Sequence, residues 1–187
     1  MKTESGEFLL RQAVDADVPA LERLIPLSVR SLQAPFYSTA QMEAALGPVF
    51  AVDRQLIGDG TYFVVEHGGQ IVACGGWSRR RAVFGGDAAR AGLAGELDPE
   101  REPARIRAFF VHPAWARRGI GRLLLRACED ALRAAGFRTA LLVATLAGEP
   151  LYAASGYTVH ERYEVPLSPG LTLPVVRMGK QFETGNP

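Results

Sequence analysis

The clearest pattern of apolar and polar positions in the chain lies over residues 120–135. Apolar side chains recur there every three or four residues in one stripe, made of Ile120, Leu123, Leu124, Ala127, Cys128, Ala131, Leu132 and Ala135. The opposite positions are charged: Arg122, Arg126, Glu129, Asp130 and Arg133. This spacing predicts an amphipathic helix with one face against the core. Gly136 is the expected stop signal.

Short runs rich in β-branched and aromatic residues predict strands. Residues 61–66 and 70–77 flank Gly68 and Gly69, a glycine pair that supplies the positive φ angles of a tight hairpin turn. Further strands are expected over residues 8–12, 105–111, 139–145, 157–165 and 173–178, with residues 166–174 connecting the last two.

Capping signals mark two of the shorter helices. Asp15 or Asp17 can cap a helix whose first turn accommodates Pro19. Ser38 followed by Gln41 is a capping box. The first of these helices is expected to end at about Leu27, and the second to cover residues 39–46. A helical continuation is expected over residues 49–57, and a short helix over residues 151–155, before Gly156.

The order of these elements predicts the fold class. Strands come early, a strand–helix–strand unit spans residues 105–145, and a hairpin closes the chain, which favours a mixed α/β sheet. At 187 residues the chain has the length of one domain. Residues 1–7 and 182–187 are expected to be polar tails, and residues 79–104 a long irregular insertion.

Composition indicates an ordinary globular protein, with 48% hydrophobic and 22% charged residues and a net charge of +1. We therefore expect no nucleic-acid or membrane partner, and read Arg79, Arg80 and Arg81 as a solvated loop edge. The chain shows no apolar signal core or membrane-length apolar run, so a cytoplasmic location is expected. Cys74 and Cys128 have no second cysteine nearby and are expected to be buried free thiols, with no metal site.

The segment that precedes the long helix has the features of an anion cradle. A predicted strand leads into a loop with Arg117 and Arg118, and then Gly119, Ile120 and Gly121 open the helix. Glycines let the backbone approach a ligand closely, and the first N–H groups of a helix lack intrahelical partners. Together with the helix dipole and the arginines, the loop is suited to a phosphate.

Two common phosphate-binding motifs do not match this loop. A nucleotide triphosphate loop requires Gly-Lys followed by Ser or Thr, whereas Gly121 precedes Arg122. A dinucleotide fingerprint requires a third glycine where Leu124 stands, and an early place in the chain. Coenzyme A is the remaining candidate.

Residues 109–125 closely resemble the acetyl-CoA-binding segment of the GNAT superfamily of N-acyltransferases, and residues 151–157 resemble its second signature. The two signatures have the family's order and separation. The resemblance implies a GNAT-like fold over residues 1–187, with a mixed sheet splayed at the cofactor site and helices on both faces. The sequence departs from the family pattern at Ala116, where Gln or Arg is usual, and at Thr145, where Asn is common.

The resemblance also implies the site for acetyl-CoA. Pantetheine amides would pair with backbone groups of Phe109, Phe110 and Val111. The diphosphate would lie on N–H groups, and the other phosphates near arginine side chains, within the set Arg117, Arg118, Gly119, Ile120, Gly121 and Arg122. Thr145 would take the position that contacts the amide end of the cofactor. No metal is implied.

The implied chemistry is direct attack of a primary amine on the thioester, with the amine on a small molecule or an amino-acid-like acceptor. Tyr152, which matches the signature tyrosine, is the candidate general acid for the departing thiolate. A backbone N–H near Phe109 or Phe110 would stabilise the oxyanion, an effect of about 3 kcal/mol in other enzymes. The general base stays open among Glu66, Glu149, His112 and a chain of waters.

The acceptor pocket is expected around residues 28–37 and under the insertion at 79–104, with Phe36, Tyr37 and Trp77 as candidate lining residues. Arg79, Arg80 and Arg81 hint at an acceptor that carries negative charge. Two alternatives stay open: a catalytically silent acyl-CoA-binding sensor, and an acetyltransferase for protein N-termini or lysines. A homodimer is a further open alternative.

Overall fold

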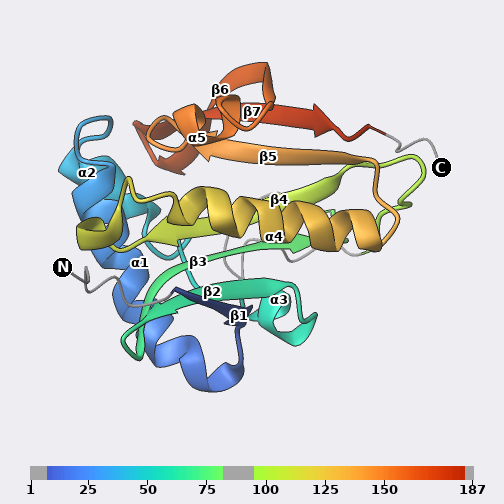
Figure 1. Ribbon diagram of the computed structural model, residues 1–187. Helices are drawn as coiled ribbons and strands as arrows, with labels where there is room; N and C mark the ends of the chain where they lie inside the picture. Colours follow the sequence, from blue (N-terminus) through green and yellow to red (C-terminus); the bar gives the residue numbers. More distant parts are fainter. Residues whose placement is uncertain (1–7, 82–94, 184–187) are drawn as a thin grey trace.

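The computed structural model describes residues 8–81 and 95–183 (Figure 1). The strands are β1 (Leu9–Gln12), β2 (Tyr62–His67), β3 (Gln70–Ser78), β4 (Ala104–Val111), β5 (Thr139–Thr145), β6 (Thr158–Ser168) and β7 (Leu171–Gln181). The helices are η1 (Asp15–Asp17), α1 (Val18–Leu32), α2 (Thr39–Ala45), α3 (Arg54–Gly58), η3 (Pro113–Trp115), α4 (Ile120–Ala134) and α5 (Glu149–Ala153).

The strands form one mixed sheet in the order β1-β2-β3-β4-β5-β7-β6. β4 and β5 run parallel, and α4 connects them across the front of the sheet as seen in Figure 1. Apolar side chains of α4 pack against one face of the sheet, beside Ile106 and Leu142. α1, α2 and α3 pack against the other face, beside Val64 and Phe110. Helices therefore cover both faces, as the sequence predicts.

The sheet opens between β4 and β5. These strands pair only over residues 104–106 and 140–142, after which β5 continues with β7 as far as Thr145 opposite Val175. Figure 1 shows the two strands diverging toward the first turn of α4. A β-bulge in β4 accompanies the opening, because the four residues from Arg107 to Phe110 lie opposite only three of β3, from Cys74 to Gly76, and Ala108 has φ 61°. The splayed mixed sheet confirms the predicted fold class.

Several local predictions are confirmed. Gly68 and Gly69, with φ of 58° and 78°, form the turn between β2 and β3. The Ser38 side chain accepts the Gln41 N–H, and the Gln41 side chain accepts the Ser38 N–H, so the capping box opens α2. The α4 and β5 boundaries lie within one residue of the prediction. Cys74 and Cys128 are buried free thiols.

Two helix predictions are wrong in extent. α1 continues five residues past Leu27, because its buried face continues through Ser28 and Val29. The helix expected over residues 49–57 begins only at Arg54, because the Asp53 side chain accepts the Leu56 N–H at 3.1 Å and caps α3 there. Residues 49–53 form an irregular segment.

The last two strands are longer than predicted, since they include both Pro166 and Pro174. β6 is an edge strand, where proline is tolerated. Pro174 lies opposite Glu164 of β6 and beyond the last residue of β7 that pairs with β5, and its carbonyl accepts the Tyr37 hydroxyl at 2.7 Å.

Three further expectations need correction or lie outside the described residues. Leu123 is 37% exposed, and Leu125, which the predicted stripe omits, is buried. Phe182 is also buried and packs in the core beside α4, so the polar tail does not begin there. The tail over 1–7, most of the tail over 182–187 and the centre of the 79–104 insertion lie outside the described residues.

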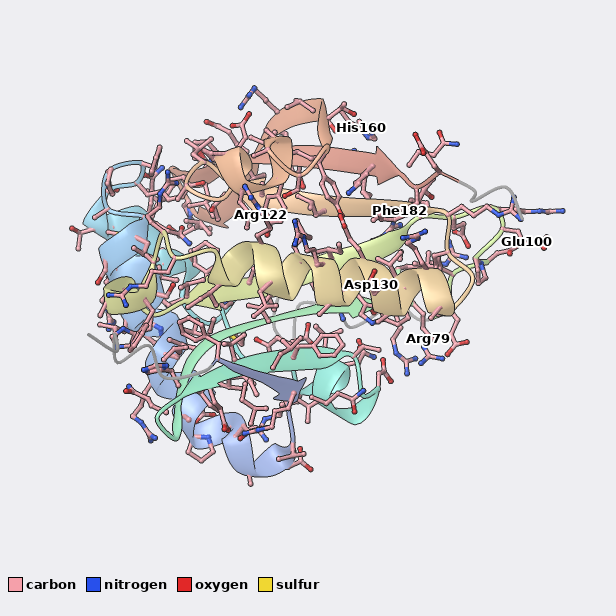
Figure 2. The ribbon with its side chains drawn as sticks, viewed as in Figure 1. Arg79, Glu100, Arg122, Asp130, His160 and Phe182 are labelled. Carbon is pink, nitrogen blue, oxygen red and sulfur yellow. The ribbon has the colours of Figure 1, made fainter. Side chains whose placement is uncertain are left out.

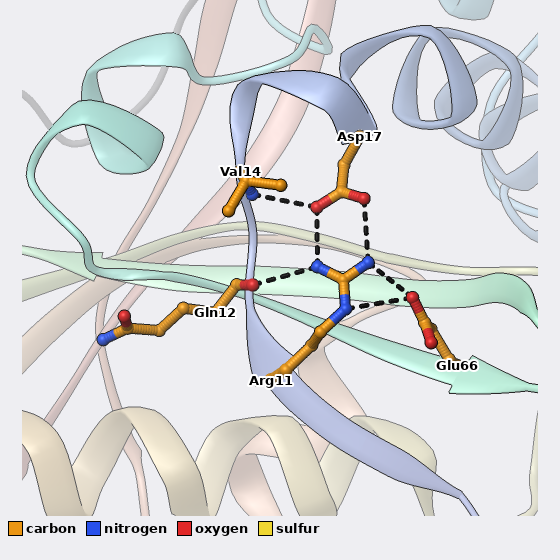
Figure 3. A network of polar contacts seen from close by, with 5 residues as sticks. All are labelled: Arg11, Gln12, Val14, Asp17 and Glu66. Atoms are coloured by element: carbon orange, nitrogen blue, oxygen red, sulfur yellow. Dashed lines mark hydrogen bonds and ion pairs between the residues drawn. The ribbon is translucent and has the colours of Figure 1, made fainter.

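A charged network fixes the first strand to its neighbours (Figure 3). The Arg11 guanidinium donates to both Asp17 oxygens, at 2.7 and 2.8 Å, and also to Glu66. Asp17 accepts the Val14 N–H at 2.8 Å as well. Arg11 therefore joins β1, the start of α1 and β2, and its hydrogen bonds lower the pKa of Asp17.

Candidate active site

A cavity of about 760 Å³ lies where β4 and β5 separate. Its floor consists of residues 106–111 of β4 and 143–145 of β5. Two walls rise from opposite faces of the sheet. The wall that we call the α4 side consists of residues 115–117, 119–122, 147–148, 150–152 and 154. The other wall, the α1 side, consists of Ser28, Leu32, Gln33, residues 49–51, Asp53, Val165, Leu173 and Val175.

The N-terminus of α4 presents free backbone donors to the cavity. Gly119 is the N-cap residue, with φ 83°, and no side chain caps the helix. In the described part of the chain, Leu123 is the first residue of this helix whose N–H has a backbone acceptor, the Gly119 carbonyl at 3.0 Å. The N–H groups of Ile120, Gly121 and Arg122 remain available, and the helix dipole adds positive potential there. This arrangement can bind an anion.

The two non-glycine residues with left-handed backbones among the described residues are Ala108 and Arg117, and both line the cavity. Such residues store about 1–3 kcal/mol of strain each and are concentrated at functional sites. Arg117 shapes the loop before α4, where the left-handed Gly119 precedes the right-handed helix and forms an anion-binding concavity. Ala108 shapes the floor. The strain therefore marks the cavity independently of any motif.

The three arginines predicted to bind phosphates differ in the direction of their side chains. Arg117 and Arg122 line the cavity. Arg118 instead stacks over Trp115, with its guanidinium 4.7 Å from the ring centroid. Figure 2 shows Arg122 between the first turn of α4 and the α5 segment. Arg122 also borders a second cavity of about 300 Å³, whose other charged residues are Arg126, Glu129 and Lys180.

Gly121 lies where a larger residue would not fit without movement. A Cβ at this position would be 3.1 Å from a methyl group of Leu151. Leu151 belongs to α5, so Gly121 allows α4 and α5 to approach closely beside the cavity.

Tyr152 supplies the aromatic hydroxyl group of the α4 side. It is 7% exposed and lines the cavity, with its ring packed edge-on against Phe109 and Tyr157 at centroid distances of 6.1 and 5.9 Å. Burial raises the pKa of Tyr152 well above its ordinary value near 10. The phenol therefore stays protonated and can act as a proton donor. Tyr157 is buried in the core, as predicted.

The floor residues have separate roles. Phe110 packs against the α1-side core, while Phe109 packs against the α4-side core beside Tyr152. The Val111 N–H donates to the Ser28 hydroxyl at 3.2 Å and so joins the end of β4 to α1. Thr145 accepts the Gly148 N–H at 3.1 Å and thereby fixes the turn before α5. All four residues that the sequence predicts on β4 and β5 line the cavity: Phe109, Phe110, Val111 and Thr145.

The candidate general bases lie elsewhere. Glu66 belongs to the Arg11 network (Figure 3), and Glu149 forms an ion pair with Arg162. The His112 ring accepts the Ala114 N–H and caps η3. None of the three candidates is a lining residue of the cavity.

The candidate aromatic residues of the acceptor pocket also lie outside the lining. Tyr37 is buried and accepts the Leu146 N–H, Phe36 is 48% exposed, and Trp77 packs against Phe137. Arg80 and Arg81 form ion pairs with Asp59 and Glu102. Figure 2 shows Arg79 near the C-terminal end of α4, far from the first turn of that helix.

The sequence predicts an acceptor pocket around residues 28–37, a range that contains Gln33, but it singles out neither Gln33 nor the pair of Asp53 and Arg107. Arg107 and Asp53 form an ion pair at 2.9 Å with both side chains almost fully buried. Gln33, at the C-terminus of α1, is a third buried polar residue there. One signal was available: Arg107 is a charged residue between apolar neighbours in a predicted strand. Asp53, which stands before α3 as its N-cap, was a second.

The geometry defines a class of protein: an α/β protein whose mixed sheet opens beside a helix N-terminus that can bind an anion. The model of the acetyltransferase (GNAT) family matches residues 27–157, which is more than half of the chain. The chain therefore belongs to the GNAT family of acetyltransferases, and the predicted enzyme class, an acyltransferase, is confirmed. No curated protein sequence matches the chain.

Solved structures with the same fold include several acetyltransferases. A GCN5-related N-acetyltransferase from Rhodopseudomonas palustris is 21% identical, with a TM-score of 0.69 over 97% of this chain and 99% of that one. The acetyltransferase yncA from Salmonella typhimurium, solved with acetyl-CoA, is 21% identical, with a TM-score of 0.61 over 96% and 97%. A ribosomal-protein-alanine N-acetyltransferase from Brucella melitensis is 19% identical, with a TM-score of 0.62 over 93% and 99%.

Among the described residues, no helix is both long and apolar enough to span a bilayer. In residues 8–81 and 95–183, no group of three or more His, Cys, Asp or Glu side chains is placed to hold a metal ion.

Proposed function

We propose that the protein transfers an acetyl group from acetyl-CoA to the primary amine of a small or amino-acid-like acceptor. The observation that carries the proposal is the cavity, which combines free backbone donors at the start of α4, the open edge of β4 and the buried phenol of Tyr152. The complex of yncA with acetyl-CoA supports this choice of donor.

The chain offers partners for each part of the donor. The N–H groups of Ile120, Gly121 and Arg122 would hold the diphosphate, with Arg117 and Arg122 side chains beside it. The adjoining cavity, with Arg122, Arg126 and Lys180, would receive a further phosphate. Because Arg118 stacks on Trp115, its side chain contributes less than the other two.

Backbone groups of β4 beyond the paired residues 104–106 would bind the pantetheine amides like an added strand. The Val111 N–H already donates to Ser28, so this pairing would use backbone groups of Phe109 and Phe110 instead. The hydroxyl of Thr145 accepts the Gly148 N–H and keeps its own proton to donate.

In the reaction, the acceptor nitrogen attacks the thioester carbonyl, a C–N bond forms, and the C–S bond breaks. A backbone N–H at the β4 bulge stabilises the oxyanion. Tyr152 donates its proton to the departing thiolate, an assistance that is typically worth about 10²–10⁴ in rate. Asp53 is the one acidic residue among the described lining residues, and it is bound to Arg107. We therefore assign removal of the amine proton to water.

The test combines a binding and a turnover measurement. Calorimetry with acetyl-CoA is expected to show one site, and a panel of primary amines is expected to release free CoA with at least one acceptor. Binding without turnover on every amine would favour a silent sensor. Absence of binding would contradict the site itself.

A further inference from the structure

The α1 side of the cavity contains a buried polar atom whose partner is missing. Gln33 is 7% exposed, and its side-chain oxygen Oε1 has no hydrogen-bond partner among the described residues. Burying an amide oxygen without a partner is unfavourable, so such an atom in a folded protein requires an explanation.

Hydrogen bonds fix the backbone of Gln33, and thereby the point from which its side chain extends. Its N–H donates to the Val29 carbonyl at 3.1 Å, and its own carbonyl accepts the N–H groups of Phe36 and Tyr37 at 2.9 and 3.0 Å. Gln33 ends α1 at the wall of the cavity, five residues after Ser28. The Ser28 oxygen accepts the Val111 N–H, so its hydroxyl proton is the second polar group that this helix presents.

The rest of this wall is mostly apolar, with Leu32, Val49, Phe50, Leu173 and Val175. Asp53 is the one acidic residue that the described part of the chain contributes to the lining, and it forms an ion pair with Arg107. An acceptor with several ammonium groups would therefore bury charges without matching carboxylates, which is strongly unfavourable. An amine on an apolar body would instead bury hydrocarbon against these side chains.

The neutral amide also suits the chemistry. The attacking amine must be unprotonated, and a carboxylate partner would favour the ammonium form. A carboxamide oxygen accepts an N–H from the neutral amine without adding charge. A rotation of the Gln33 amide about its last torsion presents either its oxygen or its nitrogen to the cavity.

We propose that Gln33 binds the acceptor amine through its side-chain oxygen, and that the acceptor is a primary amine on an apolar body. This inference rests on the proposed N-acetyltransferase function and names its substrate class. Gln33 acts here as a specificity-determining residue.

The test compares Gln33→Leu with the wild-type protein on two probes, 2-phenylethylamine and spermidine. The wild type is expected to have the higher kcat/KM for 2-phenylethylamine. Gln33→Leu is expected to raise the KM for this amine about tenfold or more, because one hydrogen bond is lost. The KM for acetyl-CoA is expected to stay unchanged. The thermal midpoint is expected to stay unchanged or to rise, since an unpaired buried oxygen is removed.

Two further variants complete the design. Gln33→Glu retains the oxygen but adds charge, so its pH–rate profile is expected to move to higher pH. Gln70→Leu, an exposed glutamine on β3 outside the cavity, is the matched control and is expected to match the wild type.

The outcomes separate the two proposals. An unchanged KM in Gln33→Leu, a lower thermal midpoint, or a preference for spermidine would overturn the assignment of Gln33 while acetylation itself continues. If acetyl-CoA binds and no amine is acetylated, the proposed function fails, and the inference falls with it.

Discussion

The α4 side and the α1 side of one cavity are built by different means. On the α4 side, consecutive residues from a single loop and helix turn their backbone donors toward the cavity, and glycines allow the close approach. On the α1 side, the polar groups are side chains from separate segments: Ser28 and Gln33 on α1, and Asp53 before α3, which forms an ion pair with Arg107 of the floor.

The difference follows from what each side would bind. A diphosphate is the same in every reaction that uses the donor, so backbone amides suffice and the side chains around them can vary. An acceptor differs from one enzyme to the next, and side chains supply that specificity. We therefore expect mutations on the α4 side to act on donor binding and chemistry, and those on the α1 side to act on acceptor use and stability.

The largest effect is expected from Gly121→Glu on the α4 side. The new side chain would press on Leu151, 3.1 Å from its Cβ position, and place a negative charge beside the diphosphate. We expect affinity for acetyl-CoA to fall by about a hundredfold or more, since both bulk and like charge oppose binding. Calorimetry measures it, with Leu123→Glu on the exposed face of α4 as control. Equal affinities in the two variants would remove the anion site from the account.

On the α1 side, Asp53→Ala is expected to act on stability. It leaves Arg107 buried without its carboxylate and removes the N-cap of α3. Breaking a buried ion pair typically destabilises a protein by about 3–5 kcal/mol. Urea unfolding measures the loss, and the double variant Asp53→Leu with Arg107→Met is expected to recover part of it. A loss below about 1 kcal/mol would show that the pair does not hold this wall together.

Tyr152→Phe tests the chemistry of the α4 side. The ring still packs against Phe109, but the proton donor is lost. We expect kcat to fall by about tenfold or more with unchanged affinity for acetyl-CoA. Tyr157→Phe removes a hydroxyl from the neighbouring buried tyrosine, outside the cavity lining, and is expected to keep its rate. Equal rates in both variants and the wild type would exclude Tyr152 from the mechanism.

A smaller effect is expected from the arginines. Arg122 borders both cavities, so Arg122→Ala is expected to weaken acetyl-CoA binding by about tenfold. Arg118 stacks on Trp115, so Arg118→Ala is expected to change the affinity for acetyl-CoA by about twofold at most. Titration of both variants in low and moderate salt tests the ranking. A larger loss in Arg118→Ala would show that its guanidinium leaves the indole to bind the donor.

The smallest effect is expected from pH. Burial raises the pKa of Tyr152, so its proton is kept to higher pH than in a free phenol. The kcat at saturating substrates is therefore expected not to fall through loss of this proton below about pH 10. A decline at lower pH that disappears in Tyr152→Phe would contradict the assigned environment of the phenol.

The same contrast explains what the sequence predicts. The α4 side is local: residues 115–122 and the helix behind them are contiguous, so their period, glycines and arginines are visible in one stretch. What this stretch does not reveal is orientation. Nothing in the order of Arg117, Arg118 and Arg122 indicates that the middle one turns away to Trp115, because that depends on how η3 packs.

The α1 side could not be predicted in the same way. Asp53 and Arg107 meet because the bulge at Ala108 places Arg107 and Phe110 on one face of β4, and the irregular segment before α3 brings Asp53 to Arg107. Gln33 lines the same cavity from the end of α1. Regular alternation would have placed the two β4 residues on opposite faces. Tyr37 and Trp77, two of the aromatic residues predicted for this pocket, are instead part of the core, and Phe36 is exposed.

A crystal structure of the protein with acetyl-CoA would test the proposed donor site and the role of Tyr152 together. We expect the diphosphate on the N–H groups of Ile120, Gly121 and Arg122, and the thioester sulfur within about 3–4 Å of the Tyr152 hydroxyl. A donor bound outside the opening between β4 and β5, or a sulfur far from Tyr152, would contradict these assignments.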